Sequence, residues 1–262
     1  MGKPKYFLRI EVAYQKHGLL LSQRKYVLDL LEEAGLLECK HASTPMEANI
    51  DLWRDDTSLL DDAGRYRRLI GKLIYLIVTR PDITFAVGVL SRFMHKHREV
   101  HWITALKILA YVKSCPGKGL LYKKHDHTHI SAFSDAGYAG DMGDRKSISG
   151  FCTYVGGNLV TWRSKKQDVV SRSSAEAEYR AMAHTACEMI WLRKFMTEFG
   201  FVQPGPMPMH CDNQDAWEKK IVSLIFTPSS QQLADILTKA TSSKVFSTIC
   251  DKLGMIDIYA PA

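Results

Sequence analysis

Long hydrophobic runs, internal repeats and low-complexity tracts are absent from this sequence of 262 residues. The most apolar stretch, LIGKLIYLIV, is interrupted by Lys72 and is shorter than the ~20 residues that a membrane-spanning helix needs. The lack of repeats and biased tracts excludes a solenoid and a largely disordered chain. We therefore expect a soluble, globular protein without a membrane partner.

Cysteine pairs with metal or disulfide spacing are absent as well. The six cysteines are widely scattered and form no C-x-x-C pair, which argues against a zinc ribbon and against a disulfide framework. The start, MGKPKYFLRIEV, lacks the charged-then-apolar pattern of a signal peptide. These absences predict an intracellular protein, cytoplasmic or nuclear, that is not secreted.

The composition itself allows a sizeable core and favours an anionic partner. Hydrophobic residues make up 46% of the chain, which suits one large domain or two modest ones. The formal net charge of +7 and the pI near 9.0 are typical of proteins that bind nucleic acid. Many basic proteins bind none, so the motifs have to decide.

Hydrophobic periodicity predicts a hairpin followed by helices in the amino-terminal half. Two strands are expected on either side of a turn at Lys16-His17-Gly18, and an amphipathic helix in QRKYVLDLLEEAGLLE. After a long polar loop, helices are expected in RYRRLIGKLIYLIV, ITFAVGVLSRFMHKH and EVHWITALKILAYVKSC. Pro116-Gly117 then ends this half.

The pattern changes near Ile130, where strands replace helices. HISAFSDAGYAG predicts a strand that runs into a turn, and GFCTYVGGNLVTW predicts two strands around Gly156-Gly157-Asn158. A long helix follows, then a short strand in MHCD and helical segments in QQLADILTK and SKVFSTICDKLGM. An antiparallel meander followed by helix, strand and helix indicates an α/β domain over residues 130–240.

The long helix opens with SRSSAEAEYRAM, in which two glutamates lie two positions apart. At ~100° per residue, Glu176 and Glu178 point ~200° away from each other and cannot serve one site. Ser173 and Glu176 have the spacing of a capping box, and Arg180 follows Glu176 by four residues. Glu176 is therefore predicted to start the helix, whereas Glu178 shares the inward-facing stripe and is the candidate functional acid.

Four carboxylates stand where this layout lets them converge: Asp135, Glu178, Asp212 and Asp235. Clustered carboxylates repel unless a cation neutralises them, and oxygen ligands are those that Mg²⁺ prefers. Two such ions ~4 Å apart support phosphodiester hydrolysis. The alternative is that the aspartates at strand ends serve turns, as they often do.

The carboxyl-terminal half contains, in this order, FSDAGYAGDMGDRKSISGF, GGNLVTWRSKKQDVVSRSSAEAEYRAMA, CEMIWL, CDNQDA and QLADILTK. Together these motifs resemble the ribonuclease H domain of copia-type retrotransposon Pol polyproteins. The upstream half resembles the end of the reverse transcriptase of the same polyproteins, through KYFLRIEVA, SQRKYVLDLLEEAGLL, YRRLIGKLIYLIVTRPDITFAV and HWITALKILAYVKSCPGKGLLY. The ordered set of motifs covers nearly the whole chain.

This resemblance implies a reverse transcriptase remnant at 1–125, mainly helical and thumb- or connection-like, and a ribonuclease H-like mixed five-stranded sheet with flanking helices at 126–262. It implies a catalytic and metal-binding D-E-D-D set at Asp135, Glu178, Asp212 and Asp235. The implied cofactor is Mg²⁺, as two ions, with Mn²⁺ as a substitute. The implied partner is an RNA:DNA hybrid or other nucleic acid, and the implied reaction cleaves the RNA strand of the hybrid, leaving a 3′-hydroxyl and a 5′-phosphate.

Basic residues near these motifs are candidate contacts to the phosphates of the hybrid: Arg145, Lys146, Arg163, Lys165 and Lys166. Such contacts give salt-dependent binding that is largely independent of base sequence. The alternative is that they are solvated loop charges.

Two departures from the family pattern bear on activity. The chain contains no Tyr-x-Asp-Asp segment, the metal-binding acids of the family's polymerase, so DNA synthesis is not expected. Only 23 positions separate Asp212 from Asp235, which indicates an internal deletion near residues 217–228 that threatens the last strand. The rival hypothesis is therefore a catalytically dead relic that acts at most as a nucleic-acid-binding module.

Overall fold

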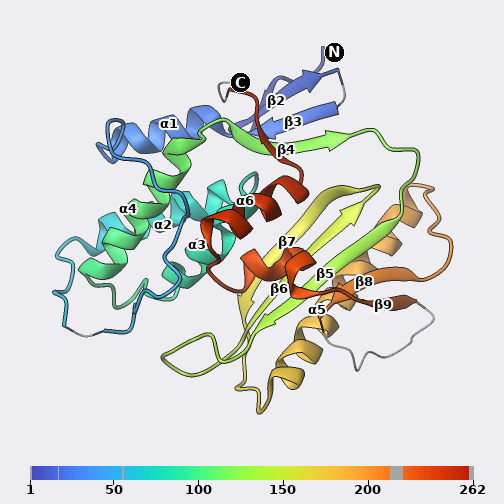
Figure 1. The fold of residues 1–262 in the computed structure, drawn as a ribbon. Coiled ribbons are helices and arrows are strands. Elements are labelled where there is room, and N and C mark those ends of the chain that lie inside the picture. The colour runs from blue at the N-terminus through green and yellow to red at the C-terminus, as the bar shows by residue number, and fades with distance from the viewer. Residues whose placement is uncertain (1, 17, 55, 213–220, 260–262) are drawn as a thin grey trace. The chain divides into compact units, whose positions relative to one another are not determined.

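The computed structural model describes residues 2–16, 18–54, 56–212 and 221–259. The chain forms two compact units (Figure 1). One unit combines Met1–Tyr122 with Ala240–Ala262, and the other is the continuous segment Lys123–Lys239. None of the helices in the described ranges is both long enough and apolar enough to span a membrane.

The unit made from both chain ends is rich in helix and also contains an antiparallel sheet. The predicted hairpin strands and helices are present, but the helix predicted in ITFAVGVLSRFMHKH ends at Ser91. His17 of the predicted turn lies outside the described residues. The helices are α1 (Arg24–Glu33), α2 (Ala63–Leu76), the 3₁₀ turn η1 (Pro81–Ile83), α3 (Thr84–Ser91), α4 (Glu99–Ser114) and α6 (Ser243–Lys252). The strands lie in the order β1 (Tyr6–Phe7), β2 (Ile10–Gln15), β3 (Gly18–Ser22), β4 (Lys118–Lys123) and β10 (Met255–Asp257).

The last residues of the chain belong to this unit, which differs from the predicted division into 1–125 and 126–262. Strand β10 pairs antiparallel with β4, with Met255 opposite Leu120. Helix α6 buries Phe246, whose ring meets that of Tyr111 edge-on at a centroid distance of 5.6 Å. Strands that pair over so great a distance in the sequence carry no local sign of that pairing. Local patterns therefore group Ala240–Ala262 with the residues that precede them in the chain.

A buried ion pair anchors the same unit. Arg80 and Asp82 are almost completely inaccessible, and their side chains are joined by hydrogen bonds of 2.8 to 3.2 Å. The hydroxyl of Tyr111 donates a further bond of 2.6 Å to Asp82. Arg80 also donates to the carbonyl of Cys115. The charges are therefore satisfied by one another and by α4, as buried charges must be.

The unit Lys123–Lys239 is α/β and contains a mixed five-stranded sheet. Its strands are β5 (Ile130–Gly137), β6 (Ile148–Val155), β7 (Asn158–Lys166), β8 (Met207–Cys211) and β9 (Val222–Phe226), in the order β7-β6-β5-β8-β9. The first three form the predicted antiparallel meander, whereas β8 runs parallel to both β5 and β9. The central strand β5 is thus flanked by one antiparallel and one parallel neighbour.

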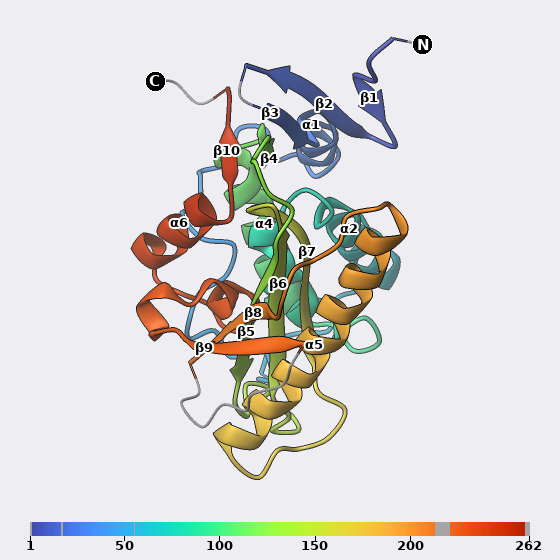
Figure 2. The ribbon, with the colours of Figure 1, turned by 90° about the vertical axis from the view of Figure 1, so that its right-hand side faces the viewer.

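Helix α5 (Ser174–Glu198) lies along one face of this sheet (Figures 1 and 2). Met182 and Met189 of α5 pack with Ile130, Ala132 and Met209 of the sheet in a buried apolar cluster. Because these helix residues recur at the 3.6-residue period, the helix presents a continuous apolar stripe. This packing fixes the rotation of α5 and therefore the direction in which Glu178 points.

The opposite face of the sheet is covered by the 3₁₀ segment η3 (Leu233–Leu237), which packs on β5 and β6 and follows the short 3₁₀ turn η2 (Ser229–Gln231). The approach is close at Gly150 of β6, where a Cβ atom would lie 2.5 Å from Cγ2 of Thr238 and 2.9 Å from Cβ of Leu237. The side chain of Gln232 caps η3 and also donates a bond of 3.0 Å to the carbonyl of Ser134. These contacts hold Asp235 against the sheet.

The fifth strand of the sheet is present although the connection between Asp212 and Asp235 is short. Val222–Phe226 forms β9 and pairs with the full length of β8, so the stretch IVSLIFT supplies the last strand. Of the residues assigned to the predicted deletion, 217–220 lie outside the described residues. The threat that the short connection posed to the sheet itself is therefore not realised.

Candidate metal centre

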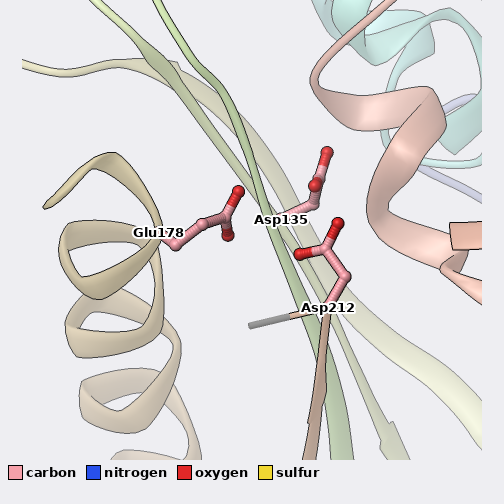
Figure 3. Close-up of side chains that lie close together, drawn as sticks. All are labelled: Asp135, Glu178 and Asp212. Atoms are coloured by element: carbon pink, nitrogen blue, oxygen red, sulfur yellow. The ribbon is translucent and has the colours of Figure 1, made fainter. Parts of the chain in front are cut away.

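Three carboxylates converge where the two parallel strands β5 and β8 end (Figure 3). Asp135 lies near the end of β5, Asp212 directly follows β8, and Glu178 stands on the second turn of α5. One oxygen atom from each of the three lies within 4.8 Å of the others. The predicted convergence of these three acids is therefore present.

The local backbone explains how an acid from the helix reaches two acids from the strands. β5 and β8 pair only at Ala132 with Met209 and at Phe133 with His210. Beyond these pairs the strands separate, and the amide of Ala136 donates its hydrogen bond to Oε1 of Glu178 over 3.0 Å. The side chain of Glu178 thus takes the place that a neighbouring strand would otherwise fill.

Negative charge accumulates at this point, and the positive charge of Lys239 offsets it only in part. Burial, together with the charges of Asp135 and Asp212, raises the pKa of Glu178 to about 8. Burial and Asp135 also raise the pKa of Asp212. Oε2 of Glu178 is buried and makes no hydrogen bond within the described part of the chain. A set of three oxygen donors with an unsatisfied carboxylate oxygen fits a hard divalent cation.

Asp235 lies beside this cluster and does not join it. It is 6% exposed on η3, and its Oδ1 forms an ion pair of 2.9 Å with Nζ of Lys239. Burial and the charge of Asp135 raise the pKa of Asp235 to about 6, while Lys239 opposes that rise. Of the four predicted acids, three therefore share one site, and the fourth is paired with a lysine.

Two residues of the site were missed by sequence reasoning. The hydroxyl of Thr238 donates a hydrogen bond to Oδ2 of Asp135, and Lys239 pairs with Asp235. Both belong to LADILTK, in which the motif predicts a role for Asp235 alone. The available signal was the spacing of four between Asp235 and Lys239, which brings side chains together on a helical turn.

The predicted role of Glu176 at the start of the long helix is confirmed. Its backbone amide donates the capping hydrogen bond of 3.1 Å to Oγ of Ser173, and its carboxylate pairs with Arg180 at 2.9 Å. One detail differs, because Oε2 of Glu176 binds the amide of Arg172 rather than that of the capping serine. Glu176 thus begins α5 and lies away from the three-acid cluster.

The predicted phosphate contacts fall into two groups. Lys166 is held by Asp141 and Asp144 at 2.9 and 3.0 Å, and Lys146 lies 3.6 Å from Asp144. These two lysines already have carboxylate partners. By contrast, Arg163 and Lys165 of β7 have exposed side chains. They line an open pocket of about 240 Å³ beside α5, together with Ser149, Phe151, His184, Cys187 and Glu188.

Arg145 occupies the turn between β5 and β6, where its backbone has a positive φ of 58°. Its amide donates a hydrogen bond of 2.8 Å to the carbonyl of Asp141. The side chain is exposed, so the guanidinium is accessible to an anionic partner.

Comparison with known proteins gives relatives over almost the full chain. The sequence is 35% identical to a retrovirus-related Pol polyprotein from transposon RE2 of Arabidopsis thaliana, over 97% of this chain and 19% of the polyprotein. It is 31% identical to the corresponding polyprotein of a Nicotiana tabacum transposon, over 90% of this chain. An uncharacterized mitochondrial protein of Arabidopsis thaliana is 39% identical, over 73% of this chain and 79% of its own length.

The lengths of these matches carry further information. The chain spans about a fifth of the length of the Pol polyproteins it matches. The match to the RE2 polyprotein extends over 279 aligned positions, whereas this chain has 262 residues, so the relative carries residues that have no counterpart here. No family model and no solved structure matches the chain.

The chain is of retroelement origin and belongs to the family of copia-type, retrovirus-related Pol polyproteins.

Proposed function

We propose that this chain is a ribonuclease H-like, Mg²⁺-dependent endonuclease segment of a copia-type Pol polyprotein, and that it hydrolyses the RNA strand of RNA:DNA hybrids. The observation that carries the proposal is the convergence of Asp135, Glu178 and Asp212 within 4.8 Å. The strand order β7-β6-β5-β8-β9, with α5 across one face, supports a ribonuclease H-like fold. Polymerase activity is not part of the proposal.

In this proposal Asp135, Glu178 and Asp212 would hold Mg²⁺ through carboxylate oxygens. The bound metal would supply an activated water and stabilise the leaving oxygen. The reaction forms a bond between a water oxygen and the phosphorus atom and breaks the bond from phosphorus to O3′, which leaves as a 3′-hydroxyl after it gains a proton. The hydrogen bond from Thr238 orients Asp135, and the amide of Ala136 orients Glu178.

The basic residues extend the proposed site toward the backbone of the substrate. Arg163 and Lys165 flank Ser164 of β7, which lies two strands away from Asp135, or ~10 Å across the sheet at the usual strand spacing. Their side chains lie on the α5 face, whereas that of Asp135 is bonded by Thr238 on the other face. We assign phosphate contacts to these two residues and to Arg145. Lys146 and Lys166 would first have to leave Asp144 and Asp141, so their contribution is the smaller one.

A second candidate function is supported by different observations. The relatives carry residues that this chain lacks, and we place the loss between Asp212 and Asp235. Asp235 is paired with Lys239 rather than with the other acids. These features favour a relic that binds nucleic acid without cleaving it.

A single assay separates the two candidates. Purified protein is incubated with an end-labelled RNA:DNA hybrid and Mg²⁺, beside an Asp135→Asn variant. The enzyme proposal expects metal-dependent cleavage of the RNA strand by the unsubstituted protein and none by the variant. Equal signals from both proteins at every metal concentration would overturn it, and binding of the hybrid in that case would support the relic.

A further inference from the structure

Lys239 brings a positive charge to the acid cluster. Its Nζ lies 2.9 Å from Oδ1 of Asp235, and its positive charge lowers the pKa of Glu178, Asp212 and Asp235 against the effect of burial. Half of the side chain remains exposed, at 49%. An exposed lysine can move away from its partner at small cost, so this pairing is a contact that a competing cation is able to break.

The three remaining carboxylates have the spacing of ligands to one ion. Octahedral Mg²⁺ binds oxygen at 2.0–2.1 Å, so ligands on opposite sides of one ion are at most about 4.2 Å apart. The oxygens of Asp135, Glu178 and Asp212 lie within 4.8 Å of one another, so a movement of at most ~0.6 Å brings each pair within that limit. A second ion would need Asp235 as a ligand, and the ammonium of Lys239 lies 2.9 Å from Oδ1 of that residue, as an ion pair without hydrogen-bond geometry.

We propose that Lys239 is a positioning residue that reserves Asp235 and thereby limits the acid set to one bound divalent cation in the absence of nucleic acid. This inference rests on the proposed metal site and adds to it a residue that controls how many ions the site takes. A lysine that merely anchored η3 would affect folding stability and would leave the number of bound ions unchanged.

The test counts bound ions without relying on cleavage. Mn²⁺ is titrated into the full chain, and bound ions are counted by electron paramagnetic resonance and by calorimetry. The unsubstituted protein is expected to bind one ion. Lys239→Met, which keeps the length of the side chain and removes its charge, is expected to bind a second ion, with an affinity raised roughly tenfold or more. Lys239→Gln is measured as a second variant in case the methionine variant folds poorly.

Three controls define the mechanism. Lys239→Arg keeps the charge and is expected to bind one ion. Lys194→Met removes an exposed charge from α5, so it changes the net charge equally and is also expected to bind one. The double variant Lys239→Met with Asp235→Asn is expected to return to one ion, because the second ligand is lost.

The outcomes separate this inference from the proposed function. If the unsubstituted protein and both uncharged variants bind the same number of ions, whether one or two, the role of Lys239 is refuted while the metal site stands. If none of these proteins binds Mn²⁺, the metal site and the role of Lys239 fail together. A second ion that appears with Lys194→Met would assign the effect to net charge and would also overturn the inference.

Discussion

Glu178 accepts a hydrogen bond of 3.0 Å from the amide of Ala136, the residue next to Asp135 in the chain. One backbone amide thus ties the helical acid to the strand that carries its neighbour. The bond holds the carboxylate of Glu178 in a position where burial and two other acids oppose its ionisation. The same geometry therefore concentrates charge for a cation and costs stability when no cation is bound.

The burial of Glu178 beside two other acids predicts an unusual pH dependence of the stability of the protein. Glu178 keeps its proton in the folded chain up to about pH 8, whereas its ordinary pKa is 4.5. Between these values the folded state binds more protons than the unfolded state, so the contribution of Glu178 to the free energy of unfolding falls as pH rises. Glu178→Gln should remove this slope and stabilise the protein at pH 8 by about 1–2 kcal/mol after solvent screening.

Urea denaturation of both proteins from pH 5 to pH 9 measures the effect. Glu176→Gln is the matched control, because it lies two residues away and its pKa is lowered by the amide of Arg172 and by Arg180. This control should lose stability and keep any nuclease activity, whereas Glu178→Gln should gain stability and lose activity. An unchanged pH slope in Glu178→Gln would contradict the prediction.

The sequence predicts the positions of site residues that depend on nearby residues in the chain, and it does not predict positions that depend on contacts between distant segments. The rotation of α5 follows from its apolar period, so the separate roles of Glu176 and Glu178 were predictable. Asp212 follows from the end of a short strand. The spacing of four between Asp235 and Lys239 is a local signal for their pairing, but the position of this pair beside the other acids depends on how η3 packs on β6, which no local pattern shows.

The close approach of η3 to the sheet predicts that Gly150 tolerates no side chain. Gly150→Ala would place a Cβ atom 2.5 Å from Thr238 and 2.9 Å from Leu237. Because both neighbours are buried, the segment has to shift, at a cost of about 1–3 kcal/mol, and the contact from Thr238 to Asp135 weakens. Thermal unfolding measures the cost. The control Gly71→Ala has open space within α2 and should stabilise by roughly 0.5–1 kcal/mol.

The assignment of phosphate contacts predicts a change in the salt dependence of binding. In an Asp135→Asn background, which prevents cleavage, Arg163→Ala and Lys165→Ala should each reduce the slope of log K against log salt by about 0.7–0.9. Fluorescence anisotropy with a labelled RNA:DNA hybrid at several salt concentrations measures the slope. Lys194→Ala is the control on α5 and should leave it unchanged. Equal slopes for all variants would show that Arg163 and Lys165 are solvated charges that do not contact phosphates.

The buried pair in the other unit predicts a large loss of stability on removal of one partner. Asp82→Asn leaves the guanidinium of Arg80 buried without a counter-charge, which costs about 3–5 kcal/mol. Hydrogen exchange in α2 and α4 measures the loss. Asp56→Asn is the matched control, since Asp56 pairs with Arg54 at 2.6 Å on the surface, and it should leave exchange in these helices unchanged.

The pairing of β10 with β4 has a consequence for the order in which the chain folds during synthesis. Lys123–Lys239 is continuous, so this unit can fold as soon as it leaves the ribosome. The other unit is completed later, because β10, the partner of β4, follows Lys123–Lys239 in the chain. Until then β4 presents an unpaired edge of the kind that captures strands from other chains. A premature stop after Lys239 would keep all four acids and leave that edge permanently exposed.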